Sequence, residues 1–209
     1  MEANLEKLAS LGGPPLGPPA LAEHAVPDSR SGTQLAALLR RVNGFYAFES
    51  ALHVFAGSGP CRGRDVAEWN DHVLWRQAYD GMADGMFFFA EDIFGVQFAI
   101  KEDAVCSFDP ETAEVTHVAV SLEDWAAVIL RDYEMLTGYP LARAWQLVNG
   151  PIKIGSRLLP KTPFVLDGDF SVANLITMDS VRGMLVRAEL ATRIRDLPDG
   201  ATVRFVITE

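Results

Sequence analysis

Histidine and cysteine are scarce in this sequence of 209 residues, which contains four histidines and two cysteines. The histidines are scattered along the chain: His24, His53, His72 and His117. No two of them are three or four residues apart, and none has a cysteine at the spacing typical of zinc ligands. We therefore predict no metal site, and we interpret His117 as a residue on the face of a strand.

Lysine and arginine are also few, because the chain has 18 of them against 28 aspartates and glutamates, a net charge of −10. A nucleic-acid-binding protein needs clustered basic side chains to neutralise phosphates, so this class is disfavoured. No apolar run approaches the ~20 residues that span a bilayer. The first residues lack the basic start and the apolar segment of a signal peptide. We expect a cytoplasmic protein with no membrane partner, in which Cys61 and Cys106 are free thiols.

Catalytic motifs are absent too, since the chain contains neither Gly-x-Ser-x-Gly nor His-Glu-x-x-His. The glycine-rich stretch 57–64 lacks the spacing of a phosphate-binding loop, and Pro60 removes a backbone donor, so we interpret it as a surface loop. Glu91 and Asp92 could form an acid/base pair, but neighbours in a strand point to opposite faces, which favours a bend there. We predict no catalytic residues and no cofactor.

The stretch 86–120 determines the predicted fold. It contains short runs of aromatic and β-branched residues, broken by a turn in which Pro110 presets φ and Asp109 can accept a backbone hydrogen bond. This pattern is typical of a meander of antiparallel strands. Apolar residues at helical spacing predict helices over 33–43, 65–79, 121–137, 141–148 and 180–194. The predicted class is α+β, an antiparallel β-sheet packed by helices.

Residues 1–32 differ from the rest of the chain in composition. After a short helix at the start, four prolines and three glycines fall within 12–19, and such a stretch cannot sustain a helix or a central strand. We predict an N-terminal arm over 1–32, loosely wrapped from residue 12 on, and a single α+β domain over 33–209, with a buried strand near 51–55 and a final strand over 202–208. The predicted core joins the sheet to its helices: Phe88, Phe98, Trp125, Ile129 and Leu185.

Negative charge is concentrated in one quarter of the chain. Residues 84–134 contain twelve Asp or Glu and two bases, Lys101 and Arg131, whereas the remainder balances at sixteen of each sign. Such asymmetry indicates a docking face for a basic protein partner, with a merely solvated surface as the alternative. The residues predicted to form the partner-binding face are Glu91, Asp92, Glu102, Asp103, Glu111 and Glu114.

Several features within 33–136 resemble the SUKH superfamily, which groups yeast cell-wall-assembly regulators with bacterial immunity proteins. These features are a helix that ends at Asn43-Gly44, a strand after it, a glycine-bearing strand pair from Phe94-Gly95 to Val105, and the segment Ser121-Leu122-Glu123-Asp124-Trp125. The resemblance implies an α+β domain without catalytic activity that binds and neutralises partner proteins, toxins among them.

The sequence therefore predicts a non-enzymatic protein-binding domain, an immunity protein that neutralises a basic toxin through an acidic face. One alternative is a small-molecule-binding regulator with a pocket lined by the aromatic residues of 45–55 and 69–79. The other is an enzyme with an unrecognised site. A deep pocket with convergent polar groups would favour these alternatives, and a shallow acidic surface would favour protein binding.

Overall fold

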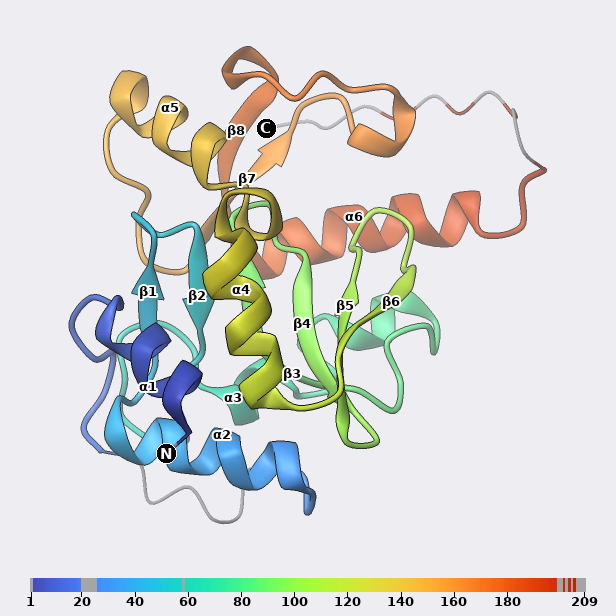
Figure 1. The fold of residues 1–209 in the computed structure, drawn as a ribbon. Helices are drawn as coiled ribbons and strands as arrows, with labels where there is room; N and C mark the ends of the chain where they lie inside the picture. The colour runs from blue at the N-terminus through green and yellow to red at the C-terminus, as the bar shows by residue number, and fades with distance from the viewer. Residues whose placement is uncertain are drawn as a thin grey trace.

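Six antiparallel strands form a sheet at the centre of the molecule (Figure 1). The computed structural model describes residues 2–19, 26–57, 59–198, 201, 203 and 205. The strands cross the sheet in chain order: β1 (Phe45–Ala47), β2 (Leu52–Val54), β3 (Phe87–Asp92), β4 (Gln97–Lys101), β5 (Ala104–Phe108) and β6 (Val115–Ala119). Each strand pairs antiparallel with the next, which confirms the predicted meander.

Helix α4 (Leu122–Thr137) covers one face of the sheet (Figure 1), with α1 (Ala3–Ser10) and α2 (Arg30–Arg41) packed beside it. The helix begins as predicted, because the Ser121 hydroxyl accepts a hydrogen bond from the backbone N–H of Asp124 at 3.2 Å. It ends at Gly138, whose φ of 67° favours glycine. A side chain at this position would collide with Phe94 and Ile93, so the close approach also requires glycine.

The opposite face of the sheet is covered by α3 (Val66–Trp69), the 3₁₀ helix η1 (Arg76–Tyr79) and α6 (Ser180–Ile194). Aromatic side chains fill this layer, and each is buried: Trp69, Trp75, Tyr79, Phe88 and Phe108. The Tyr79 hydroxyl lies 2.9 Å from the carbonyl oxygen of Pro110 and 3.2 Å from that of Met184. It thereby links the sheet to α6.

A two-stranded hairpin and a helix complete the domain. Strands β7 (Ser156–Pro160) and β8 (Leu175–Asp179) pair antiparallel and enclose two short 3₁₀ helices, η2 (Phe164–Leu166) and η3 (Val172–Asn174). Helix α5 (Tyr139–Asn149) packs against the hairpin through Trp145 and Leu175, at the top of Figure 1. These parts and the two helix layers form one α+β domain, as predicted.

The predicted core is confirmed for one face of the sheet only. Phe98, Trp125 and Ile129 share a buried cluster under α4. Phe88 is also buried, but it points to the opposite face, because its neighbour Phe89 takes the position facing Trp125. Leu185 is 42% exposed, so its place in the core was wrong, and α6 buries Met184 and Ala188 instead.

The prediction of an N-terminal arm differs from the structure over the first residues. Leu5 and Leu8 of α1 are buried in the core cluster under α4, and Leu16 is buried too. The backbone N–H of Gly13 donates to Tyr46 O at 2.8 Å, and that of Leu16 donates to Gly44 O at 3.0 Å. These residues pack as part of the domain, whereas residues 20–25 lie outside the described part of the chain.

Two further predictions differ from the structure. The helix expected over 65–79 is divided into α3 and η1, because Asn70 ends α3 by donating its side-chain amide to Val66 O and Phe88 O. The hairpin of β7 and β8 was not predicted. The final strand expected over 202–208 falls mostly on residues outside the described ones. Cys61 and Cys106 are free thiols, as expected. In the part of the chain that the structure describes, no helix is long and apolar enough to cross a membrane.

Candidate functional site

Three of the six carboxylates predicted to form a partner-binding face are buried. Glu91, Asp92 and Glu111 are 1%, 6% and 5% exposed. Each accepts hydrogen bonds inside the protein, so their place on an exposed acidic face was wrong. Glu91 and Asp92 do not form an isolated bend either, because they are the last two residues of β3.

The other three carboxylates do not share one surface. Glu102 and Asp103 form the turn between β4 and β5, whereas Glu114 directly precedes β6 at the opposite end of β5. Asp103 is also engaged, because its Oδ1 accepts the backbone N–H of Ser31 at 2.8 Å. A single continuous acidic face of these six residues is therefore excluded.

A cleft instead opens where three loops meet α6, and we call it the loop cleft. It has a volume of about 380 Å³. Its walls come from the turn between β3 and β4, the turn between β5 and β6, the segment after β7, and the side chains of Met135 and Arg187. The residues from the loops are Asp92, Phe94, Val96, Asp109, Pro110, Glu111, Thr112, Phe164, Val165 and Phe170.

Asp92 shapes the first wall of the loop cleft. Its Oδ1 accepts the backbone N–H groups of Phe94 and Val96, both at 2.8 Å. Gly95 between them has a φ of 79°, which this tight turn requires. Burial raises the pKa of Asp92 to about 8 although both hydrogen bonds lower it.

Glu111 joins two walls of the loop cleft. Its Oε2 accepts the backbone N–H of Val165 at 2.9 Å, which fixes the segment after β7 against the turn between β5 and β6. Asp109 shapes that turn, because its Oδ1 accepts the Glu111 N–H at 2.7 Å. Burial raises the pKa of Glu111, as it does that of Asp92.

Phenylalanine rings form the outer wall of the loop cleft. The rings of Phe164 and Phe170 stack in parallel, with centroids 4.0 Å apart. Phe94 meets Phe164 edge to face at 5.3 Å. Phe170 is 71% exposed, so one face of the stacked pair is open to solvent. Arg187 also lines the cleft; it is buried and donates to the carbonyl oxygen of Phe94.

A second hollow, which we call the helix groove, lies between α4 and strands β5 and β6. It has a volume of about 700 Å³ and is lined by residues 107, 116–118, 128 and 131–136. Met135 is 86% exposed and lines both the helix groove and the loop cleft, so the two hollows adjoin. Helix α4 departs from helical geometry at Asp132, which pairs with Arg131 at 2.7 Å. His117 lies on the exposed face of β6, as predicted.

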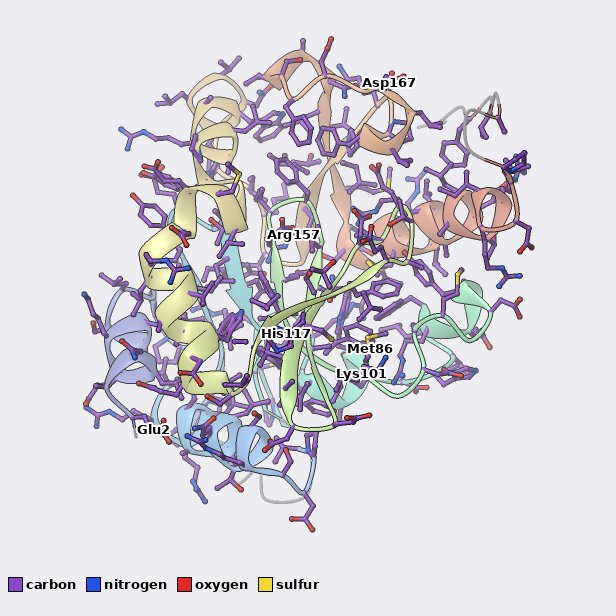
Figure 2. All side chains as sticks on the ribbon, turned by 45° about the vertical axis from the view of Figure 1, so that its right-hand side comes forward. Glu2, Met86, Lys101, His117, Arg157 and Asp167 are labelled. Carbon is purple, nitrogen blue, oxygen red and sulfur yellow. The ribbon has the colours of Figure 1, made fainter. Side chains whose placement is uncertain are left out.

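A buried charge cluster holds the sheet to the hairpin behind the loop cleft. Arg157 of β7 places its Nε 2.9 Å from Oε1 of Glu91, and His53 of β2 places its Nδ1 3.0 Å from the same oxygen. Figure 2 shows Arg157 in the interior of the molecule. Burial alone would raise the pKa of Glu91, but Arg157 and the hydrogen bond from His53 lower it to about 2. Burial also lowers the pKa of His53 to about 4.

The sequence prediction missed His53, Arg157 and Arg187, and it placed Glu91 on the surface instead of in this cluster. No local signal identifies them, because His53, Glu91 and Arg157 come from three separate strands and their polar character suggests exposure. Among the aromatic residues of 45–55 and 69–79, Phe55, Trp69 and Trp75 stack on one another in the core. No group of three or more metal-ligating side chains occurs among the residues that the structure describes.

Comparisons with known proteins show a similar fold. No protein-family model and no curated protein matches the sequence. Among solved structures, the crystal structure of Atu4351 from Agrobacterium tumefaciens is similar, with a TM-score of 0.57 and 14% sequence identity. The similarity covers 90% of this chain and 89% of that chain. At this identity the likeness concerns the fold alone.

Proposed function

We propose that this protein is a non-enzymatic binding domain that docks a basic partner protein on the surface formed by the loop cleft and the helix groove. The observation that carries the proposal is the exposed apolar side chains where the two hollows adjoin. Met135 is 86% exposed and Phe170 is 71% exposed. Large apolar side chains in a concave surface with a polar rim are typical of protein interaction sites.

The charge of this surface supports a basic partner. Three accessible carboxylates, Asp109, Asp132 and Glu134, stand in its lining against the guanidinium groups of Arg131 and the buried Arg187. Asp92 and Glu111 also line it, but they are buried and burial raises the pKa of both, so they add less negative charge. Complementary charge speeds the encounter of two proteins and excludes partners of the same sign. The carboxylates of the proposed docking site thus lie within the acidic segment 84–134, but the accessible ones are not among the six that the sequence indicated.

The hydrogen bonds of the loop cleft favour binding over catalysis. Asp92 is bonded to the backbone of its own turn, Glu111 to Val165 and Arg187 to Phe94. A general acid or base needs to reach the reacting proton of a substrate. These three side chains instead fix the loops in place, which suits a preorganised docking surface.

The class of partner follows from the resemblance to immunity proteins described above. We propose a toxin as the partner, which this protein neutralises by covering the functional surface of that toxin. A basic toxin, such as a nuclease, suits the charge of the docking surface. The product of a neighbouring gene is the first candidate to test.

The proposal is tested by titrating the candidate partner against two double variants. Met135→Glu with Phe170→Glu places charge in the docking surface and should weaken binding by at least about tenfold. Leu147→Glu with Val148→Glu is the matched control, because these α5 side chains are 78% and 75% exposed but line neither hollow. In cells, the wild type and the control pair should protect against the partner's toxicity, and the first pair should not.

Two results would contradict the proposal. One is binding of the Met135/Phe170 pair as tight as that of the wild type. The other is an equal loss of binding in the control pair, which would place the interface elsewhere. The rate of association should also fall with added salt, because exposed charges are screened over ~8 Å at physiological ionic strength.

A further inference from the structure

The loop cleft combines carboxylates with open aromatic faces, and this combination suits a cation. Asp92 and Glu111 line it and are each more than nine-tenths buried. Asp109 is the third carboxylate of the lining, in the same turn as Glu111. Buried carboxylates are normally paired with a cation, because an uncompensated buried charge is costly.

The chain supplies too little positive charge to this cleft. Arg187 is the one basic residue in the lining, and its Nε and Nη1 donate to the carbonyl oxygens of Gly183 and Phe94. Among the described residues, none forms a salt bridge with Asp92, Asp109 or Glu111. Burial raises the pKa of both Asp92 and Glu111, and it outweighs Arg187, which lowers both, and Arg157, which lowers that of Asp92.

The aromatic wall adds a second, independent feature. Phe164 and Phe170 are stacked with an angle of 1° between their rings, and Phe94 meets both edge to face. Because Phe170 is 71% exposed, an aromatic face remains uncovered at the mouth of the cleft. Planar guanidinium groups stack on such faces and also form paired hydrogen bonds with carboxylates.

We propose that the loop cleft binds an arginine side chain of the partner protein, with the guanidinium group between the carboxylates and the exposed ring of Phe170. The cleft volume of about 380 Å³ accommodates one such side chain. The inference rests on the proposed function for the source of the arginine. The site itself can be tested without a partner.

The test is an NMR titration of the whole chain with N-acetyl-arginine amide. The reporters are the backbone amides of Phe94, Val96 and Val165, since they donate to the Asp92 and Glu111 carboxylates. We expect saturable shifts at these amides, with a dissociation constant on the order of 1 mM. N-acetyl-citrulline amide has the same shape without the charge and should cause no saturable shift.

Two variants locate the probe. Phe170→Ala removes an exposed ring, and Asp109→Asn keeps the acceptor oxygen of the turn while removing its charge, so neither should disturb the fold. Each should weaken binding of the arginine probe about fivefold. Val148→Ala on α5 is the control and should leave binding unchanged.

Equal shifts with arginine and citrulline, or affinities unchanged in both variants, would overturn the inference. The proposed function would still stand if a partner bound the wild type and the Met135/Phe170 charge pair prevented it. If no partner bound at all while the arginine probe did, the proposed function would fail and the cation site would remain.

Discussion

Replacing Arg157 with methionine should destabilise the protein strongly, because it leaves Glu91 buried without its guanidinium partner. Both side chains are 1% exposed, and Arg157 Nε lies 2.9 Å from Glu91 Oε1. Breaking a buried ion pair on one side typically costs ~3–5 kcal/mol. This is a large part of the ~5–15 kcal/mol by which a domain of this kind is stable. The loss is measured as the difference in the free energy of unfolding by urea at pH 7.

The double variant Glu91→Gln with Arg157→Met should lose less stability than Arg157→Met alone. It contains no uncompensated charge, and a neutral pair that fits the space is often as stable as a buried ion pair. Nη2 of Arg157 has no hydrogen-bond partner among the described residues. Burying this atom away from water therefore destabilises the native pair, and no hydrogen bond offsets that loss. Arg143→Met is the control, because Arg143 and its partner Glu49 are both exposed, and it should change the urea midpoint little.

The pH dependence of the loss gives a second check. In the wild type the pKa of Glu91 is lowered to about 2, so its contribution to stability is fully present above the unfolded pKa of 4.5 and is lost as the pH falls from 4.5 to about 2. In Arg157→Met the buried carboxylate lacks that cation and its pKa rises, so the variant regains stability as the pH falls. The difference in the free energy of unfolding between the wild type and Arg157→Met should therefore become smaller as the pH falls. This reasoning would be refuted if Arg157→Met lowered the free energy of unfolding at pH 7 by less than about 1 kcal/mol. It would also be refuted if the double variant were as unstable as Arg157→Met.

Two further predictions concern the buried histidine and the first helix. Burial and Arg157 lower the pKa of His53 to about 4, so the unfolded chain binds a proton below pH 6.5 that the folded one does not. From pH 7 to pH 5 the free energy of unfolding by urea should therefore fall by about 2 kcal/mol more in the wild type than in His53→Gln. The titration of Asp92 affects both proteins and cancels in this comparison. Equal losses would show that the pKa of His53 is not lowered. Leu8→Ala should lower the free energy of unfolding by about 2–5 kcal/mol because Leu8 is fully buried. Leu11→Ala is the control and should lower it little, because Leu11 is 51% exposed. A Leu8 variant as stable as this control would mean that α1 does not belong to the core.

Local patterns were sufficient to predict the sheet and its main helix. Alternating apolar residues identified β3 to β6, and the capping residue Ser121 with the stripe of Trp125 and Ile129 identified α4. Each of these signals lies within a single helix or strand, because capping and the spacing of apolar residues act between neighbours in the sequence. In α6 the pattern did not distinguish the buried Met184 from the exposed Leu185, because both are apolar and only packing separates them.

The candidate site could not be predicted in the same way. Charge along the sequence indicated an acidic surface, but whether a carboxylate is exposed depends on partners far away in the chain. Glu91 is buried because Arg157, 66 positions later, reaches it, and Glu111 because Val165 donates to it. The loop cleft exists only after five separate segments meet, so its lining has no signature in any one of them.

Hydrogen–deuterium exchange of the protein with and without its bound partner tests the central claim most directly. The account predicts that the partner slows exchange at Phe94, Val96 and Val165 in the loop cleft and at residues 116–118 in the helix groove. Exchange at 147–149 of α5 and at the turn 102–103 should be unchanged. Protection of α5 or of that turn, with the loop cleft and the helix groove unaffected, would contradict the account.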